Sequence, residues 1–313
     1  MKIVIPGGSG QVGTLLARAF HGAGHEVVVL SRGAATAPWR VLPWDAETLG
    51  DWAAEVDGAD AVINLAGRNV NCRYDEKNRR EMMASRVDST RAVGEAIGRA
   101  GHPPPVWLQA STATLYAHRY DAANDEASGI VGGSEPDAPK KWRFSIEVVQ
   151  AWERALEEAV TPRTRKVALR SAVVLSPDPG GIFDVLLGLV RHGLGGRSGN
   201  GRQYVSWIHH VDFVRAVEWL LGRDDVSGPV NLAAPNPLPN ADFMRALRQA
   251  WGMPFGLPAT EWMLEIGALF LRTETELVLK SRRVVPGRLL REGFTFQFPT
   301  WPEAARELCE EWR

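Results

Sequence analysis

The sequence predicts an α/β protein in which a doubly wound parallel sheet is followed by a smaller, mainly helical C-terminal cap. The chain opens with a strand, a glycine turn and a helix, and apolar strand patterns then alternate with helical patterns as far as residue 175. Such alternation is typical of parallel sheets whose strands are joined by right-handed helical crossovers. Beyond residue 175 the chain changes to a glycine-rich loop and shorter segments, which indicates a second structural unit.

The glycine turn is the first candidate site. Residues 3–5 form a short apolar strand, glycines follow at Gly7, Gly10 and Gly13, and a helical pattern begins by residue 15. This Rossmann-like arrangement presents backbone N–H groups and a positive helix end to a pyrophosphate. Gly7 allows the tight turn, Gly10 lets the backbone approach phosphate, and Gly13 permits close packing of helix on strand. We therefore predict a nucleotide site; a purely structural turn is the alternative.

The end of the second strand indicates which dinucleotide is bound. Residues 26–30 form this strand, and it ends in Ser31 and Arg32. An acidic side chain about twenty residues after the glycines would bind the ribose 2′-hydroxyl of NAD. Arg32 instead suits a 2′-phosphate, because its planar guanidinium pairs well with phosphate oxygens. The prediction is NADP(H) rather than NAD, and the alternative is an exposed arginine without a ligand.

Later strands bring small and polar residues to the same edge of the sheet. Further strands are predicted at residues 41–42, 59–65 and 106–110, with a sixth running from 166 through 175; helices are expected at about 75–100 and 144–159. The strand at 59–65 is followed by Ala66 and Gly67, and the strand at 106–110 delivers Ser111 and Thr112. In open α/β sheets ligands bind at the carboxyl ends of the strands. Residues 117–141 form a polar loop that could cover a substrate.

The second half of the chain is expected to complete the sheet and build the cap. Strands are predicted at residues 203–208 and 229–233, and helices at 211–221, at about 240–250 and 260–280, and from about 303 to the end. We therefore assign residues 1–175, with about 209–235, to an NADP-binding Rossmann domain. Residues 176–208 and 236–313 form the predicted substrate or cap domain.

Composition limits the classes of protein. The 313 residues are 45% hydrophobic and 23% charged, with a formal net charge of −1, which favours neither nucleic acid nor an anionic membrane as partner. The two cysteines have no paired spacing, and His209 and His210 are adjacent, so neither a disulfide framework nor a metal site is expected. The first strand occupies the place of a signal peptide, and the apolar segment 262–271 is too short to span a bilayer. We expect a cytoplasmic protein.

A longer set of motifs carries a resemblance to a known family. They are Gly7 to Gly13, Gly24-His25-Glu26-Val27 with Arg32, Asn64-Leu65-Ala66-Gly67, Ser85-Arg86-Val87 with Thr90, Trp152-Glu153, Arg170 to Leu175, Gly199 to Gln203, Trp207-Ile208-His209, Asn231 to Pro235 and Pro286 to Leu290 ahead of Gly293-Phe294. With these motifs the whole chain resembles extended members of the short-chain dehydrogenase/reductase superfamily. It is specifically similar to NAD(P)-binding epimerase family proteins that carry an uncharacterised C-terminal domain.

The resemblance implies particular site residues. Ala66, Gly67 and Arg86 would line the cofactor, and Ser171 would lie near the nicotinamide. Thr112 falls at the position of the catalytic Ser/Thr, where its hydroxyl would bond a substrate oxygen; the alternative is a threonine that satisfies a backbone group at a strand end. The full set expected around the cofactor is Gly7, Ser9, Gly10, Gln11, Val12, Gly13, Arg32, Leu65, Ala66, Gly67, Arg86, Ala110 and Ser171.

The chain departs from the superfamily at its Tyr-x-x-x-Lys pair, in which a lysine lowers the pKa of a tyrosine that transfers protons. Counted back from Trp152-Glu153, those two positions fall near Ser145 and Val149. None of the four tyrosines has a lysine four residues later. Tyr116 is the candidate substitute, as is Tyr120, with Lys140 or Lys141 approaching through space. The alternative for Tyr116 is a packed aromatic beneath the loop.

Two functions follow from these predictions. The first is an NADP(H)-binding, epimerase-like oxidoreductase that acts on a small carbonyl or sugar-nucleotide-like substrate between sheet edge and cap. Arg202, Gln203 and Trp207 are the substrate-side candidates, and loop packing is the alternative for each. The second is a non-catalytic NADPH-binding sensor or scaffold, since the tyrosine–lysine pair is missing. A homodimer through the two long helices of the Rossmann domain is a further expectation from the superfamily.

Overall fold

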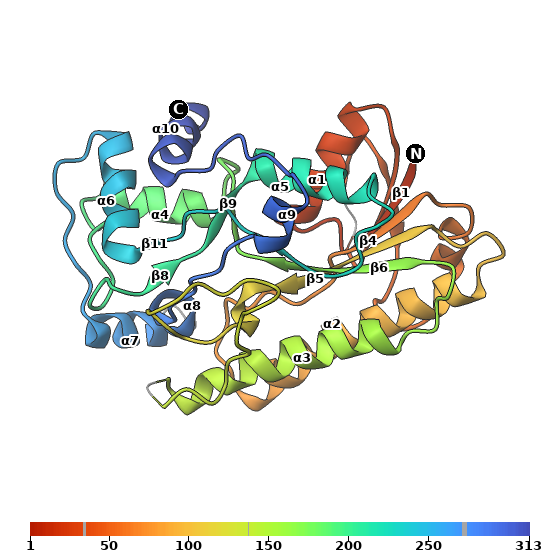
Figure 1. Cartoon of the computed structure of the whole chain (residues 1–313), viewed down its shortest axis with the longest axis horizontal. Coiled ribbons are helices and arrows are strands. Elements are labelled where there is room, and N and C mark those ends of the chain that lie inside the picture. The colour runs from red at the N-terminus through yellow and green to blue at the C-terminus, as the bar shows by residue number, and fades with distance from the viewer. Residues whose placement is uncertain (34–35, 137, 271–273) are drawn as a thin grey trace.

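The computed structural model describes residues 1–33, 36–136, 138–270 and 274–313, and it centres on a seven-stranded sheet (Figure 1). Every neighbouring pair of strands is parallel, in the order β10-β6-β5-β4-β1-β2-β3. The strands are β1 (Lys2–Pro6), β2 (Glu26–Ser31), β3 (Arg40–Pro43), β4 (Ala61–Asn64), β5 (Val106–Thr112), β6 (Arg165–Ser171) and β10 (Gly228–Leu232). The strand order reverses beside β1, so its carboxyl end lies at the switch point where such sheets bind ligands.

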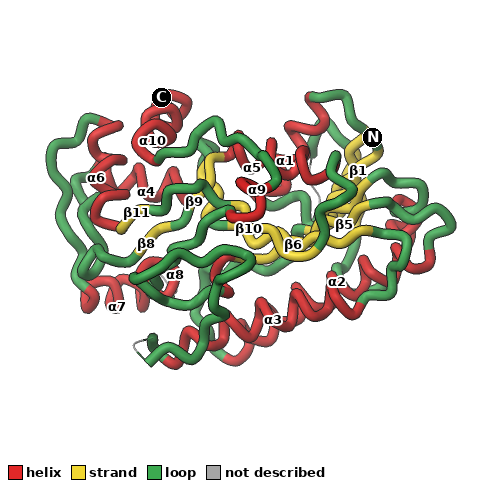
Figure 2. The backbone as a smooth tube through the Cα atoms, in the orientation of Figure 1, coloured by secondary structure: helices red, strands yellow, loops and turns green. Residues whose placement is uncertain are grey.

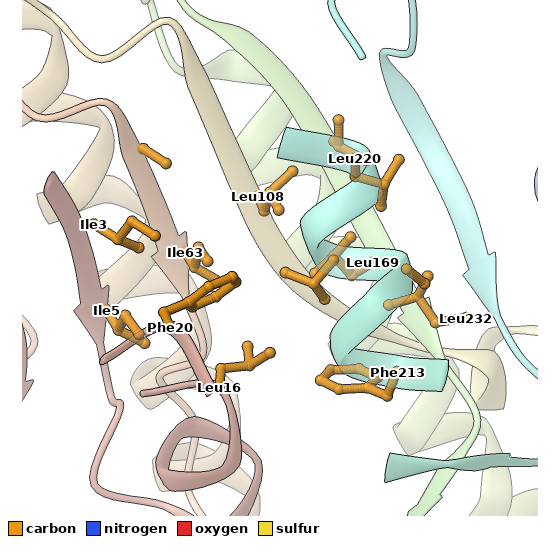
Figure 3. Close-up of a cluster of buried hydrophobic side chains, with 14 of the residues drawn as sticks. Ile3, Ile5, Leu16, Phe20, Ile63, Leu108, Leu169, Phe213, Leu220 and Leu232 are labelled. Atoms are coloured by element: carbon orange, nitrogen blue, oxygen red, sulfur yellow. The ribbon is translucent and has the colours of Figure 1, made fainter. Parts of the chain in front are cut away.

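Helices cover both faces of this sheet, as expected for a doubly wound fold. Figure 1 shows α1 (Gln11–Gly22) and α5 (His210–Leu221) on one face, and α2 (Glu76–Arg99) and α3 (Arg143–Glu158) on the other. On the first face Leu16 and Phe20 of α1 and Phe213 of α5 pack against Ile3 and Leu169 of the sheet (Figure 3). A separate buried cluster joins the other face to α2 and α3. The predicted fold class is confirmed.

A third buried cluster lies in the part of the molecule beyond β6. Figure 2 shows that this part consists of helices and short strands, which are the remaining elements of the chain. They are β7 (Val173–Leu175), α4 (Ile182–Arg191), β8 (Tyr204–Val205), β9 (Trp207–His209), β11 (Leu238–Pro239), α6 (Asn240–Trp251), α7 (Glu261–Phe270), α8 (Glu276–Leu279), α9 (Gly287–Arg291) and α10 (Trp301–Trp312). Leu289 and Phe294 of the C-terminal region nevertheless pack in the cluster on the α1–α5 face of the sheet. Short 3-10 turns lie at Asp51–Glu55, Ala113–Leu115 and Lys140–Trp142.

Several elements differ from their predicted form. The sixth strand does not run on to residue 175. The Ala172 N–H still donates to Leu232 O of β10 at 2.9 Å, but beyond it β7 pairs with β9 in a separate two-stranded sheet. The strand predicted at 203–208 is interrupted at Ser206, whose hydroxyl donates to Arg282 O at 2.6 Å. Helix α4 was not predicted.

The helix expected at about 260–280 is present as α7 and α8, and residues 271–273 between them lie outside the described residues. Within the described ranges, no helix combines the length and the apolar character needed to cross a membrane.

Candidate functional site

The glycine turn and the loop after β4 meet at the switch point of the sheet. Gly7 has a φ of 74°, in the left-handed region that favours glycine. A Cβ on Gly7 would lie 2.6 Å from the backbone of Ala66, so even alanine would collide with the neighbouring loop. The Leu65 N–H donates to Pro6 O at 2.8 Å and fixes the two chains at this spacing. Leu65, Ala66 and Gly67 therefore lie directly beside the turn.

Gly10 and Gly13 differ in what surrounds them. A Cβ on Gly13 would come within 2.5 Å of Gly8 Cα, so this glycine is required for packing of α1 on the turn. A Cβ on Gly10 would have only Gly7 O within 4 Å, at 3.7 Å. Gly10 is the N-cap of α1 and provides no side-chain cap, which leaves the first N–H groups of the helix to an external acceptor. The open side of Gly10 thus fits a phosphate.

The remaining residues of the turn support its shape. The Ser31 hydroxyl donates to Ser9 Oγ at 2.9 Å and joins the turn to the end of β2. Val12 packs against the core beneath α1. Gln11 points toward Gly181, just before α4, so it connects the turn to the second half of the chain.

Arg32 lies at the rim of a surface hollow beside the end of β2. The hollow is lined on its other sides by residues 45–47 and by Arg68, Glu81, Ser85 and Asp88. Arg32 is exposed and forms no ion pair with any residue in the described ranges. Arg68, in contrast, is paired with Glu81 and donates to Asn78 Oδ1 at 2.6 Å. An unpaired guanidinium at this position has the chemistry that a 2′-phosphate requires.

Arg86 supports the loop after β4 from below. It donates to Met82 O and to Arg68 O, each at 3.0 Å, and its guanidinium lies 5.1 Å from the ring of Trp152. A Cβ on Gly67 would come within 3.3 Å of the guanidinium carbon. Burial lowers the pKa of Arg86 to about 10. The side chain therefore holds Gly67 in place.

Two buried amides align the ends of β4 and β5, and the sequence analysis did not assign them. Asn64 Nδ2 donates to Gln109 Oε1 at 3.0 Å, and Asn64 Oδ1 accepts from the Ala66 N–H at 3.1 Å. Ala110 follows on β5, and Ser171 lies opposite Thr112 in the β5–β6 register. Two polar residues in otherwise apolar strands were the available signal, because a buried amide requires partners.

Thr112 satisfies a local backbone group in this structure. Its Oγ1 accepts from the Thr114 N–H at 3.2 Å and donates to Thr114 Oγ1 at 3.2 Å. This is the alternative stated for Thr112, although the side chain is only partly buried at the carboxyl end of β5. One hydroxyl bonded to a neighbouring hydroxyl can exchange that partner for a substrate oxygen.

Tyr116 is a packed aromatic with a fully bonded hydroxyl. The side chain is 2% exposed, its O–H donates to Asn231 Oδ1 at 2.9 Å, and it accepts from Arg170 Nη1 at 3.0 Å. Arg170 forms a bidentate ion pair with the carboxylate of Glu153, at 2.8 and 2.7 Å. The same carboxylate also accepts a hydrogen bond from Ser111 Oγ at 2.6 Å. Burial raises the pKa of Tyr116. This network faces β6 and β10, and its geometry gives Tyr116 a structural role.

The positions of the missing pair are occupied by other chemistry. Ser145 on α3 donates to Glu276 Oε2 at 2.6 Å, and Val149 is buried with Leu115 and Ile146. Lys141 pairs with Glu265 of α7 at 3.2 Å. The lysine that approaches this region is instead Lys280, whose Nζ donates to Thr114 O at 2.7 Å. Neither Glu276 nor Lys280 was singled out by the sequence analysis, because both lie more than a hundred residues from Ser145.

The three substrate-side candidates divide between interior and surface. Trp207 is fully buried, with its ring 5.1 Å from that of Trp301. Gln203 is 2% exposed and donates to Ser198 O at 2.9 Å. Arg202 is exposed and lies 5.8 Å from the ring of Tyr120. The structure therefore gives Trp207 and Gln203 packing roles, and Arg202 alone offers a charged group to solvent.

A cluster with metal-ligand chemistry lies away from this edge. Ligand atoms of His209, His210 and Glu307 are within 4.8 Å of one another. His209 Nδ1 accepts from the Val211 N–H at 3.3 Å, so the neutral ring carries its proton on Nε2, which donates to Glu307 at 2.7 Å. His210 bonds Glu311 at 2.9 Å. Because Nε2 of His209 already serves as a donor, these contacts are hydrogen bonds that join the end of β9 and the first residue of α5 to α10.

The comparisons with known proteins agree with this geometry. Residues 3–233 match the NAD dependent epimerase/dehydratase family, and residues 259–308 match a domain of unknown function, DUF1731. Epimerase family protein SDR39U1 of Bos taurus is 33% identical over 312 residues, which cover 98% of this chain and 99% of that protein. Epimerase family protein Mb2239 of Mycobacterium bovis is 32% identical over 303 residues, covering 96% and 95%. The chain belongs to the NAD dependent epimerase/dehydratase family.

Solved structures give the same result. The crystal structure of human epimerase family protein SDR39U1 with NADPH is 31% identical to this chain, with a TM-score of 0.86 and 99% of each chain covered. A nucleoside-diphosphate sugar epimerase from Corynebacterium glutamicum is 28% identical with a TM-score of 0.76, over 99% of this chain and 58% of that one. The resemblance stated from the motifs is confirmed.

Proposed function

We propose that the chain binds NADP(H) and acts as an epimerase-like oxidoreductase on a small carbonyl or sugar-nucleotide-like substrate. The observation that carries the proposal is the combination of an open glycine turn with Arg32 at the end of β2, whose guanidinium has no ion-pair partner within the described ranges. The similarity over the full chain to human SDR39U1, whose structure is described with NADPH, supports the same cofactor.

The residues fit a dinucleotide laid across the carboxyl edge of the sheet. The N-terminus of α1 would hold the pyrophosphate, and Arg32 the 2′-phosphate. Ala66 and Gly67 would line the middle of the cofactor, and Thr112 and Ser171 would flank the nicotinamide. The bound cofactor would supply hydride chemistry. Thr112 would then donate a hydrogen bond to the substrate oxygen.

A second function is supported by the residues at the missing pair. Ser145 and Val149 have neither the phenol nor the ammonium of the Tyr-x-x-x-Lys motif. A protein with the cofactor half alone would serve as a non-catalytic NADPH sensor or scaffold. The two functions differ in one observable property: an enzyme must have another proton-transferring group near Thr112.

The test is calorimetric titration with NADPH and with NADH, on the wild type and on Arg32→Asp. We expect the wild type to prefer NADPH and the variant to lose about 10-fold or more in NADPH affinity, roughly 1.4 kcal/mol, with little change for NADH. Arg40→Asp is the matched control, since Arg40 is an exposed arginine on β3 paired with Glu55 at 2.9 Å. Equal losses for both dinucleotides would show that Arg32 has a structural role, and no binding of either would refute the proposal.

A further inference from the structure

The C-terminal segment covers the place where the superfamily's tyrosine and lysine fall. Residues 274–284 lie against the loop that follows β5, where the Asn124 N–H donates to Arg283 O at 2.7 Å and the Ser281 N–H donates to His118 Nδ1 at 2.8 Å. Figure 2 shows α8 beside this loop, near the start of α3. The segment therefore places its own side chains among those of β5 and α3.

Glu276 of α8 is the central side chain of this contact. It is 1% exposed, and its Oε2 accepts from Ser145 Oγ at 2.6 Å. Its Oε1 is buried and has no hydrogen-bond partner among the described residues. A buried carboxylate oxygen without a partner is costly and rare in folded proteins. The cost indicates that Oε1 has a role that this resting arrangement does not satisfy.

Charged groups surround this carboxylate. Lys280 Nζ lies 3.9 Å from Glu276 Oε1, and Lys280 is itself 3% exposed. Arg282 Nε donates to Thr114 Oγ1 at 3.3 Å, which in turn bonds Thr112. Lys280 Nζ also donates to Thr114 O at 2.7 Å, so Lys280 links the carboxylate to the turn after β5, near which the substrate oxygen of the proposed function would lie.

Burial changes the protonation of this carboxylate and of the groups beside it. Burial raises the pKa of Glu276 against the opposing effect of Arg282 and Lys280. Burial lowers the pKa of Lys280 to about 8. Burial, with the nearby Glu276, raises the pKa of Tyr74 to about 12. The titratable and charged groups that face Glu276 are Tyr74, Glu274, Lys280 and Arg282.

We infer that Glu276 is the catalytic proton-transferring group of this site, with Lys280 as its charge partner and Ser145 as the residue that positions it. The inference rests on the proposed function. In carbonyl reduction the Oε1–H bond of protonated Glu276 breaks and an O–H bond forms on the substrate oxygen, which takes the electron pair of the C=O π bond. The carbon receives hydride from the reduced nicotinamide, the reductant, and Glu276 regains its proton from solvent.

A structural role alone explains less of the geometry. An ion pair that only docks the C-terminal segment would satisfy both carboxylate oxygens, as Glu153 does with Arg170 and Ser111. Oε1 of Glu276 is left without a donor, 3.9 Å from an ammonium group. Contacts of catalytic groups are often long before substrate binds and shorten in the complex.

The experiment measures proton release on cofactor binding by calorimetry of the full chain in two buffers of different ionisation enthalpy. The positive charge of oxidised nicotinamide favours ionised Glu276, so in a series of titrations at increasing pH NADP⁺ should release more protons than NADPH. The 2′-phosphate is common to both ligands and cancels in the difference. We expect Glu276→Gln to remove the difference and to leave NADPH affinity within about twofold.

The matched control is Glu307→Gln, because burial also raises the pKa of Glu307, to about 7, but it lies on α10 beside β9. Glu307→Gln should retain the wild-type difference in proton release between NADP⁺ and NADPH binding. If Glu276→Gln does not fold, Ser145→Ala provides the second variant. Loss of the hydrogen bond to Oε2 raises the pKa of Glu276, so the difference in proton release between the two dinucleotides should move to higher pH. An active carbonyl substrate should show a kcat loss of about 100-fold in Glu276→Gln.

The results separate this inference from the function on which it rests. Dinucleotide binding without a difference in proton release in the wild type would overturn the role of Glu276 and leave the cofactor proposal standing. A difference that persists in Glu276→Gln would do the same. No binding of either dinucleotide would refute the proposed function, and the inference with it.

Discussion

The two halves of the candidate site are built in different ways. The half that we propose to bind the dinucleotide is built mainly of backbone from β1, the start of α1 and the loop after β4, which lie within the first 67 residues. The opposite half consists of side chains from α3, the turn after β5 and α8, which are far apart in sequence. The comparison teaches that a backbone-built site constrains residue type at fixed spacings, whereas a side-chain site can recruit its groups from another segment.

The physical reason is the range of the interactions. Gly7 must be glycine because its φ is 74° and Ala66 lies 2.6 Å from where its Cβ would be. No substitution elsewhere can supply that space. A carboxylate, in contrast, needs only to reach the correct point, and Glu276 reaches the side chain of Ser145 from α8. Four predictions test this comparison.

The largest effect is expected at the glycine turn. In Gly13→Val the new Cβ would lie 2.5 Å from Gly8 Cα, and the backbone at Gly8 would have to move to relieve this overlap. We expect the free energy of unfolding, measured with urea, to fall by more than about 3 kcal/mol. Gly22→Ala on the same helix meets nothing within 4 Å and should be close to neutral.

Gly10→Val is the paired variant within the turn. A side chain on Gly10 would have open space around it, so the free energy of unfolding should change by less than about 1 kcal/mol. NADPH affinity should fall at least about 100-fold, because the valine side chain would occupy the position proposed for the phosphate. Retained NADPH affinity in folded Gly10→Val would break the comparison, since the backbone-built half would then not bind the cofactor.

An intermediate effect is expected in the network beneath the site. Glu153→Gln leaves the Arg170 guanidinium without its carboxylate, although both side chains are mostly buried. We expect a loss of about 2 kcal/mol in unfolding free energy, because an unpaired buried charge is costly. Glu292→Gln, in the more exposed pair with Arg223, should cost less than about 1 kcal/mol. Equal losses would show that burial of Glu153 contributes little.

The smallest effect concerns Lys280 and pH. Its pKa is about 8 in the folded protein against 10.5 for an ordinary lysine, so between these values the unfolded chain binds a proton that the folded chain does not. Stability attributable to Lys280 should therefore rise by about 1 kcal/mol between about pH 8 and pH 9. Urea unfolding of Lys280→Met across this range should lack that rise. An unchanged profile would place Lys280 in a solvated environment and weaken its role beside Glu276.

The sequence by itself determined the features that depend on residues close together in the chain, namely the buried strands and the glycine turn. The alternating strands predicted the parallel sheet, which is confirmed, because strand burial depends on neighbouring residues. The glycine spacing predicted the close turn beside Ala66, whereas the role of Arg32 in cofactor binding stays a prediction. The resemblance to the superfamily, not a local signal, placed Ser145 and Val149 at the positions of the missing tyrosine and lysine. Local patterns did not predict the end of the sixth strand at Ser171, because that break depends on the pairing of β7 with β9, which lies more than thirty residues further along the chain.

Only the tertiary structure decided what replaces the missing groups. Tyr116 was a reasonable substitute by position, but burial against Asn231 and Arg170 gives its hydroxyl two structural partners. Glu276 and Lys280 carry no motif in the sequence, and they reach Ser145 and Thr114 through contacts that span more than a hundred residues. Side-chain chemistry assembled over such separations is set by packing of the whole chain, and packing is not encoded in any local pattern.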